Sequence, residues 1–282
     1  MTSATGRSGM ESGFGDVQPR QLIVTIFGLY ARAEHNWLSV ASLVRLMSDI
    51  GIDGPAVRSS VSRLKRRDTL RSMRLDGAVG YALSPSMLEV LQEGDARIFA
   101  RRRATLDDGW VLVVFSVPET ERDKRHELRT WLTRLGFGTA EPGVWIAPGN
   151  LAHEVKEVLV RRGLDTYVDI FRGNHVAFDD LKSKVKLWWD LGDLSAQYAR
   201  FIDHYRPLAQ RLAKKSVSDS QAFHEYIPLL TAWRRLPYLD PGLPLELLPA
   251  RWNGVTAGEI FNELHSRLDE SARRHAVGVI HG

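Results

Sequence analysis

Residues 38–84 read LSVASLVRLMSDIGIDGPAVRSSVSRLKRRDTLRSMRLDGAVGYALS. Within this stretch Val57, Val61 and Leu64 recur at i, i+4 and i+7, so they share one face of a helix that must pack inward. The opposite face carries serine and arginine. Small hydroxyl side chains let a helix approach DNA closely, and arginine reaches bases or phosphates. The pattern therefore predicts an amphipathic helix whose outer face suits a DNA major groove.

The residues before this helix predict another helix and a tight turn. Ser39 is a suitable N-cap for a helix that ends near Gly51, where glycine favours the left-handed backbone of a helix end. Asp53 can cap the following helix, and Pro55 is tolerated in its first turn. Two helices joined by a short glycine-containing turn are typical of a DNA-binding helix-turn-helix.

Two alternating segments after the second helix predict a β-hairpin. Residues 70–75 and 79–83 flank Asp76-Gly77, a dipeptide that favours a tight turn. This hairpin would form the wing of a winged helix-turn-helix, and its arginines could touch the DNA backbone.

The position of each side chain on the second helix predicts what it contacts. Residues near the start of such a helix usually meet the bases. For base contact we predict Arg58, Ser59, Ser62 and Arg63. For phosphate contact we predict Arg66, Arg67 and Arg74. Ser60 is expected to pack inside the protein, and Lys65 is either a contact or a solvated side chain.

Basic residues are concentrated in the same stretch. Residues 53–74 hold seven Lys and Arg against two Asp, a net charge of +5, whereas the whole chain carries +4. Such a local excess is expected of a protein that binds the phosphate backbone. A solvated charged face is the alternative, and the apolar register, the turn and the hairpin favour DNA. For Arg101–Arg103, DNA contact and a solvated linker both stay open.

Composition restricts the protein to certain classes. The chain has 282 residues, enough for two or three domains, and 44% of them are hydrophobic, as is ordinary for a folded soluble protein. The absence of cysteine excludes disulfides, zinc-thiolate sites and thiol catalysis. No apolar run approaches the roughly 20 residues that span a bilayer. Residues 1–19 lack the apolar core of a secretory signal, so we expect a disordered tail and cytoplasmic residence.

The remaining pattern predicts an α+β multidomain protein. Residues 20–103 would form the N-terminal winged helix-turn-helix domain. In residues 104–178 apolar and amphipathic segments follow the order β-α-β-β-α-β, which predicts a central ferredoxin-like domain. Residues 179–282 are mainly helical, with an irregular proline-rich loop at 236–252 and a last helix at 258–274. This C-terminal domain is expected to bind an effector and to dimerise.

Several segments, taken in order, resemble PaaX-type transcriptional regulators over nearly the whole chain from about residue 20. They are LIVTIFGLYAR at 22–32, AVRSSVSRLKRR at 56–67, GYALS at 80–84, WVLVVFSVPE at 110–119, GVWIAP at 143–148 and DPGLPLELLPARWNG at 240–254. The resemblance implies a bacterial repressor that binds double-stranded operator DNA as a homodimer. It also implies release from DNA by an aryl-CoA thioester, typified by phenylacetyl-CoA, and control of genes that degrade phenylacetate and related aromatics.

A binding site for such an effector needs cations for the phosphates and an apolar slot for the acyl group. The residues that could supply both are Trp188, Trp189, Tyr198, Arg200, His204 and Arg206. The alternative is that the tryptophan pair packs the C-terminal domain against the central one. The proline-rich residues 243–252 could line a pocket or clasp the helices together.

An enzyme is the alternative function: a metal-dependent nuclease or a CoA-thioester-acting enzyme with a DNA-binding domain. The central domain also resembles, in strand order, a ferredoxin-like CRISPR-associated nuclease family with a metal-binding Asp at the end of the first strand. Here that place reads Phe115-Ser116-Val117, and Asp123 and Asp169 remain as scattered acids. No Walker loop, HExxH or GxSxG motif occurs. We therefore expect no enzyme, no metal and no cofactor.

A third alternative is an RNA-binding or scaffold protein that uses the central sheet. Residues 104–178 carry nine Lys and Arg against eleven Asp and Glu, a net charge of −2. The stacking aromatics of an RNA-binding sheet are also not evident in these strands. Both observations favour the repressor.

Overall fold

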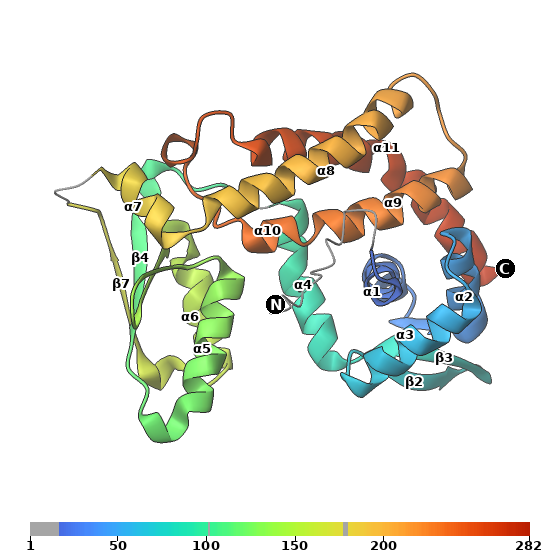
Figure 1. The fold of residues 1–282 in the computed structure, drawn as a ribbon. Coiled ribbons are helices and arrows are strands. Elements are labelled where there is room, and N and C mark those ends of the chain that lie inside the picture. The colour runs from blue at the N-terminus through green and yellow to red at the C-terminus, as the bar shows by residue number, and fades with distance from the viewer. Residues whose placement is uncertain (1–16, 101, 177–179) are drawn as a thin grey trace, which may run out of the picture. The chain divides into compact units, whose positions relative to one another are not determined.

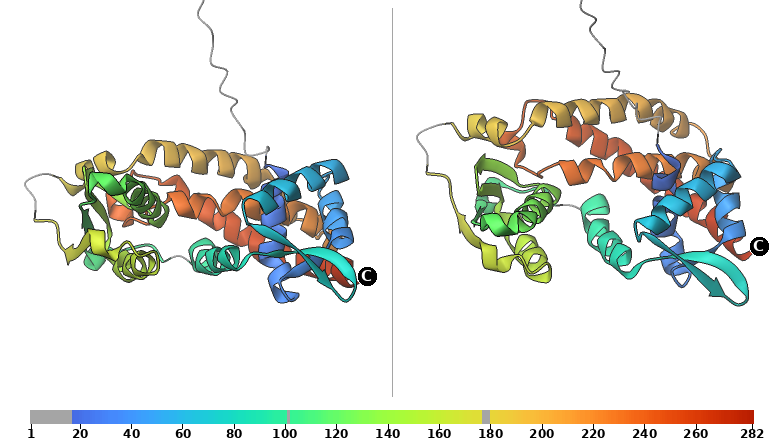
Figure 2. Two further views of the ribbon diagram at one scale, coloured as in Figure 1. Left: turned by 90° about the horizontal axis from the view of Figure 1, so that it is seen from below. Right: turned by 60° about the horizontal axis from the view of Figure 1, so that its bottom comes forward.

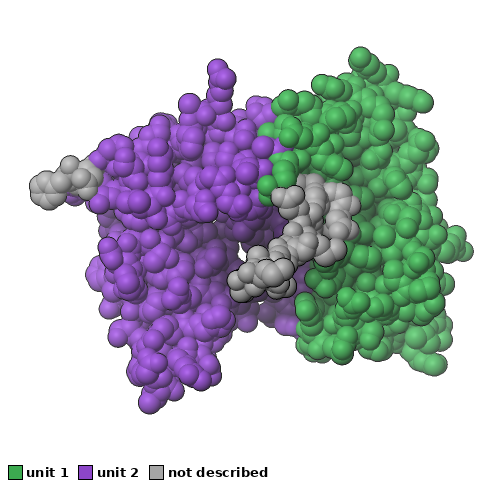
Figure 3. Space-filling view, in the orientation of Figure 1, with its two compact units in different colours: residues 1–84, 200–232, 260–282 green, residues 85–199, 233–259 purple. Residues whose placement is uncertain are grey.

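The computed structural model describes residues 17–100, 102–176 and 180–282. The chain divides into two compact units, each assembled from segments distant in the sequence (Figure 3). Unit 1 comprises residues 1–84, 200–232 and 260–282, and unit 2 comprises residues 85–199 and 233–259. The expected domains are continuous segments instead, so their boundaries stay predictions. The expected tail lies outside the described residues as far as residue 16.

Unit 1 begins with helices and a small sheet. Its helices are α1 (Pro19–Leu29), α2 (Val40–Asp49) and α3 (Gly54–Arg66). Its strands are β1 (Trp37–Ser39), β2 (Leu70–Leu75) and β3 (Ala78–Leu83), which form an antiparallel sheet in the order β1-β3-β2. Ile23, Ile26 and Phe27 of α1 are fully buried, which explains why this helix is apolar on most sides.

Side chains cap the two helices as the sequence predicts. The Ser39 hydroxyl accepts a hydrogen bond from the backbone N–H of Ser42 at 2.9 Å. The Asp53 carboxylate accepts one from the backbone N–H of Ala56 at 2.7 Å. Gly51, between the helices, has φ +80°, a backbone conformation that favours glycine. The predicted start of α3 is therefore confirmed.

The β2–β3 hairpin turns at the predicted dipeptide and extends from the helices of unit 1 (Figure 2). Asp76 and Gly77 have φ of 49° and 80°, as a type I′ hairpin turn requires. The sequence does not predict strand β1, which pairs with β3 through Trp37 opposite Ala82. Gly80 permits this pairing, because a Cβ there would lie 2.3 Å from the Leu38 carbonyl oxygen.

Helices from the C-terminal third complete unit 1. They are parts of α8 (Leu191–Leu212), α9 (Asp219–Trp233) and α11 (Asn253–His281). A hydrogen bond of 2.7 Å joins Thr25 of α1 to Thr231 of α9 in the buried interior. His275 of α11 contacts the Asp49 carboxylate of α2 at 2.8 Å. The segment that contains α1 and α2 therefore folds together with the C-terminal helices.

Unit 2 contains a four-stranded antiparallel sheet with helices on one face (Figure 1). Its strands are β4 (Trp110–Phe115), β5 (Gly138–Glu141), β6 (Val144–Pro148) and β7 (Val168–Gly173), in the spatial order β5-β6-β4-β7. The covering helices are α5 (Arg122–Leu135) and α6 (Ala152–Arg161). Val111 and Val113 of β4 pack with Leu128, Leu132 and Leu159 in the core between these layers.

The remaining helices of unit 2 are α4 (Pro85–Phe99), α7 (Leu181–Trp188) and α10 (Leu236–Leu239), with parts of α8, α9 and α11. Short 3-10 helices occur at Ala31–Ala33 in unit 1 and, in unit 2, at Leu106–Asp108, Glu119–Glu121, Gly149–Leu151, Asp165–Tyr167 and Leu245–Leu247. In the described part of the chain, no helix has the length and hydrophobicity needed to cross a membrane.

The C-terminal helices extend further than predicted. The loop predicted at 236–252 contains α10 and a 3-10 helix, and the last helix begins at Asn253 and ends at His281, although 258–274 was expected. Pro228 predicts a kink or a break in this helix; α9 continues through it, so the helix is not broken there. Buried side chains on both sides of the proline, including Tyr226 and Leu230, hold this helix together by packing.

Candidate nucleic-acid interface

The inner face of α3 fixes the direction of its outer face. Val57, Val61 and Leu64 are 2%, 4% and 5% exposed, which confirms the predicted register. Ser60 is also buried, as expected for a packing residue. Because these residues hold α3 against unit 1, the intervening residues must point toward solvent.

All residues predicted to contact DNA are exposed, and they lie on α3, at its C-cap or on β2. These are Arg58, Ser59, Ser62, Arg63, Arg66, Arg67 and Arg74. Lys65 is exposed as well, which fits either of its two interpretations. The helix and the hairpin thus present hydroxyl and guanidinium groups on accessible surface.

The arginines of this surface differ in their partners. Arg71 on β2 forms an ion pair with Asp68 at 3.0 Å, and this hydrogen bond lowers the pKa of the Asp68 carboxyl. Within the described residues, Arg58, Arg66 and Arg67 form no ion pair. Arg74 on the hairpin also forms no ion pair with any residue that the structure describes. Their guanidinium groups are therefore available to an anion from outside the chain.

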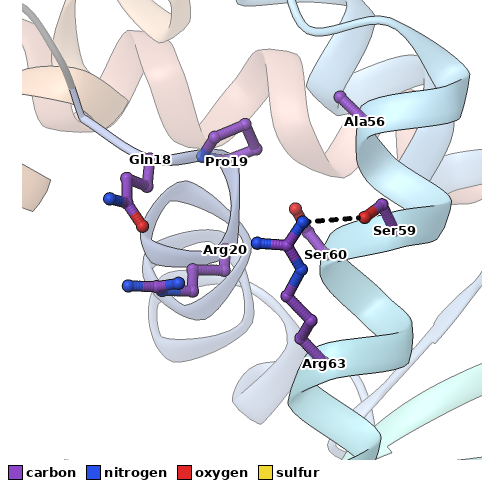
Figure 4. Close-up of a pocket in the computed structure, with 7 residues that line it drawn as sticks. All are labelled: Gln18, Pro19, Arg20, Ala56, Ser59, Ser60 and Arg63. Carbon is purple, nitrogen blue, oxygen red and sulfur yellow. Dashed lines mark hydrogen bonds between the residues drawn. The ribbon is translucent and has the colours of Figure 1, made fainter.

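Unlike these arginines, Arg63 forms a side-chain hydrogen bond within α3. Its Nη2 donates a hydrogen bond to the Ser59 hydroxyl at 3.2 Å, one turn back along α3. Figure 4 shows its guanidinium between α3 and the first turn of α1. A cavity of about 330 Å³ occupies this place. It is lined by Gln18, Pro19, Arg20, Ala56, Ser59, Ser60 and Arg63.

Arg20 is the residue of this region that sequence reasoning missed. It follows Pro19 at the start of α1 and is half-buried. In Figure 4 its side chain extends along the side of the α1 turn away from α3. No local signal marks Arg20, because only the packing of α1 on α3 brings it next to residues some 40 positions later.

The arginine cluster after α4 has internal partners in unit 2. Arg102 lies 2.6 Å from the Asp108 carboxylate. Arg103 lies 3.0 Å from the Asp240 carboxylate and also donates to the Leu243 carbonyl oxygen. Arg103 is thus held within unit 2, whereas the Arg102 side chain is 66% exposed, so DNA contact and a solvated linker both stay open for Arg102. Arg101 lies outside the described residues.

Three residues predicted for the effector pack inside unit 2. Trp188 and Trp189 contact each other and the Trp110 ring, with ring centroids 5.7 to 6.3 Å apart. The Trp189 indole N–H donates to the Gly136 carbonyl oxygen at 3.0 Å. The Tyr198 hydroxyl donates to Asp240 at 2.9 Å and is buried. The tryptophan pair thus packs α7 against the central sheet, as its alternative interpretation expects.

The other three effector candidates, Arg200, His204 and Arg206, are exposed on the part of α8 that belongs to unit 1. The six residues are thus divided between the units, and their common site stays a prediction. Within unit 2, a cavity of about 450 Å³ lies beside Trp189, with Lys186 and Leu187 among its lining residues.

The acids considered for a nuclease lie on exposed elements of unit 2. Asp169 is on β7 opposite Val114 of β4, and Asp123 is in the first turn of α5. In the residues that the structure describes, no group of three or more His, Asp and Glu side chains is placed to hold a metal ion.

Comparison with known proteins identifies the family. Three family models match in sequence order: "PaaX-like protein" at residues 18–87, "PaaX protein central Cas2-like domain" at 103–185 and "PaaX-like protein C-terminal domain" at 189–278. "Transcriptional repressor PaaX" of Escherichia coli (strain K12) is 27% identical over 263 residues, which cover 91% of this chain and 82% of that protein.

A solved structure has a similar fold. "Uncharacterized protein Rv0674 from Mycobacterium tuberculosis" matches with a TM-score of 0.59 and 22% identity, over 92% of this chain and 99% of that chain. With the three models covering nearly all of the described residues, the chain belongs to the PaaX family.

Proposed function

We propose that this protein is a transcriptional repressor that binds operator DNA through α3 and the β2–β3 hairpin. One observation carries the proposal: α3 presents exposed arginines that have no carboxylate partner among the described residues, on a helix fixed by a buried apolar face. Its similarity to the transcriptional repressor PaaX of E. coli supports it.

We assign specific architectures to the two sheets. Helices α2 and α3 with the hairpin form a winged helix-turn-helix, in which α3 enters the major groove. The sheet of unit 2 is ferredoxin-like, since its elements follow the order β-α-β-β-α-β with the first and third strands in the centre. The wing then lies beside the groove, where Arg74 reaches a phosphate.

The position along α3 separates base contacts from backbone contacts. The Arg58 guanidinium reaches back over the start of the helix, where its Nη1 would lie 3.3 Å from a Cβ added at Gly54. Arg58 and Ser62 are therefore the base-contacting residues of this proposal. Arg66 and Arg67, near the end of α3, bind phosphates.

The repressor is proposed to act as a homodimer on two half-sites of a pseudo-palindrome, in the cytoplasm where the chromosome lies. An aryl-CoA thioester such as phenylacetyl-CoA would release it from the promoters of phenylacetate-type catabolic genes. Such an effector acts only by binding more tightly to the DNA-incompetent state. The family resemblance supports these roles, and the family match favours a repressor over the enzymatic alternative.

A fluorescence-anisotropy titration tests the proposal. The purified full-length protein is titrated onto its own upstream promoter DNA and onto a random duplex of equal length. The titration is repeated with phenylacetyl-CoA, phenylacetate and CoA. We expect tight binding to the promoter that the thioester alone abolishes. Equal affinity for both duplexes would contradict operator recognition, whereas binding that no additive changes would contradict only the effector.

A further inference from the structure

We propose that the cavity between α1 and α3, with the α1 turn beside it, is a binding site for the DNA backbone, where Arg63 on the α3 side of this turn and Arg20 on its other side each contact phosphate oxygens. The inference rests on the proposed function and extends it in two respects. It adds Arg20 of α1 to the DNA-binding residues. It also makes Arg63 a phosphate contact, although the sequence predicts a base contact.

The first step is the direction of Arg63. Helical side chains point toward the N-terminus of their helix, which brings Arg63 to Ser59 four residues earlier. The hydrogen bond of 3.2 Å holds the guanidinium there, between α3 and the first turn of α1 (Figure 4). A guanidinium in this place lies beside α3, whereas base edges would lie in front of it. The Ser59 hydroxyl accepts from Arg63, and a hydroxyl that accepts a hydrogen bond can also donate its O–H to an anion.

The second step is the charge of the cavity wall. Its seven lining residues include two arginines and no acid. Arg20 is half-buried, and within the described residues neither arginine has an ion-pair partner. Two neighbouring cations with no acid beside them favour an anion, because a phosphate backbone that contacts both offsets their like charge. The first turn of α1 contains no acidic residue that could do this internally.

The third step is the choice of anion. Guanidinium groups bind phosphate oxygens with paired N–H donors, a geometry that a lysine cannot reproduce. The cavity adjoins the N-terminal half of α3, next to the residues proposed to face the bases. A backbone that flanks the groove would pass over this place, with Arg63 on one side of the α1 turn and Arg20 on the other.

The test uses full-length Arg20→Ala and Arg63→Ala variants, with Lys156→Ala as a control that removes one exposed charge from α6 in unit 2. Affinity for promoter and random duplexes is measured against salt concentration. Each arginine variant should weaken binding to both duplexes by the same factor, roughly tenfold. Each should also reduce the slope of log K against log salt by about 1. The lysine variant should change neither.

A second arm locates the phosphate. Promoter duplexes with a single neutral methylphosphonate linkage are scanned across one half-site. At one position the neutral linkage should weaken DNA binding by the wild-type protein but not by Arg20→Ala, because the variant already lacks the contact to that phosphate. Inorganic phosphate and CoA are added separately. Suppose that either compound changes the DNA affinity of Arg20→Ala by a different factor from that of the wild-type protein, while both proteins have the same slope of log K against log salt. The cavity then binds a free phosphate compound, and the backbone assignment is wrong.

Failure of this inference differs from failure of the proposed function. If Arg63→Ala weakens only promoter binding, Arg63 reads a base and the proposal for the cavity is overturned. If Arg20→Ala behaves like Lys156→Ala, Arg20 does not contact DNA. Both results leave the repressor intact. Only a wild-type protein with no preference for its promoter would remove the function itself. Arg20→Lys, which keeps the charge, should recover the salt slope but only part of the affinity.

Discussion

The arginines of α3 and Arg97 of unit 2 have opposite surroundings. Arg97 of α4 is 8% exposed and donates hydrogen bonds to the carbonyl oxygens of Leu135 and Pro237. Its guanidinium also lies over the Tyr238 ring, 5.4 Å from the centroid. Burial lowers the pKa of Arg97, and the nearby Glu154 carboxylate partly offsets this effect. In contrast, the Arg58 side chain on α3 is exposed and lacks an ion-pair partner among the described residues.

This difference separates stability from function for one residue type. A buried guanidinium whose donors are satisfied joins the elements of its own unit, so removing it should destabilise the protein. An exposed guanidinium without an internal partner contributes little to the folded state, so its removal should affect an external anion instead. Arg71, exposed but paired with Asp68, stands between the two groups. Four predictions follow from this contrast.

Replacing Arg97 should have the largest effect on stability. Arg97→Ala removes the hydrogen bonds that Arg97 donates to the carbonyl oxygens of Leu135 and Pro237, together with its packing against Tyr238. We expect the free energy of unfolding of unit 2 to fall by about 3 kcal/mol. Urea unfolding followed by tryptophan fluorescence measures this change. Arg102→Ala is the matched control, because the Arg102 side chain is 66% exposed although it pairs with Asp108. A loss below about 1 kcal/mol for both variants would contradict the structural role of Arg97.

Replacing Arg58 should leave stability unchanged and weaken sequence recognition. Arg58→Ala is expected to weaken promoter binding by about 1–3 kcal/mol, the usual value of a good base contact. Binding to a random duplex should change much less. Anisotropy titrations on both duplexes measure the ratio of the affinity for the promoter to the affinity for random DNA. If that ratio equals the wild-type ratio, Arg58 does not read a base.

Replacing Arg66 should weaken binding to every duplex alike. A phosphate contact carries no sequence information, so Arg66→Ala should reduce affinity for promoter and random DNA by the same factor. The slope of log K against log salt should fall by about 1. Titrations at several salt concentrations measure it, and an unchanged slope would argue that Arg66 stays solvated in the complex.

Removing the charge of Asp68 should have the smallest effect, and this effect should be an increase in affinity for DNA. Asp68→Asn releases Arg71 from its ion pair and removes a negative charge beside the proposed DNA surface. Affinity for random DNA should rise roughly twofold to fivefold, as expected for an exposed pair. Arg71→Ala should then reduce DNA affinity by a smaller factor in the wild-type protein than in the Asp68→Asn variant. Equal costs would mean that the ion pair does not restrain Arg71.

Short-range signals made α3 and the hairpin predictable. The spacing of Val57, Val61 and Leu64 determines the buried face, and Asp53 marks the start of the helix within one residue. Asp76-Gly77 marks the turn because both residues tolerate positive φ. These signals need no knowledge of the rest of the chain.

Contacts between distant residues could not be predicted from the sequence. Strand β1 has three residues and exists only because it pairs with β3. Arg103 pairs with Asp240, 137 positions away, and nothing in the sequence around Arg103 indicates that partner. Arg20 reaches the surface beside α3 only through the packing of α1. In each case tertiary structure, and not local preference, decides the role of the residue.

The most direct measurement compares the wild-type protein with an Arg58→Ala/Arg66→Ala/Arg67→Ala variant by anisotropy on the upstream promoter and on random DNA. Urea unfolding of the same samples is measured in parallel. We predict unchanged unfolding, loss of promoter preference and much weaker binding to both duplexes. A variant that folds like wild type and binds its promoter equally tightly would show that α3 is not the DNA-binding element.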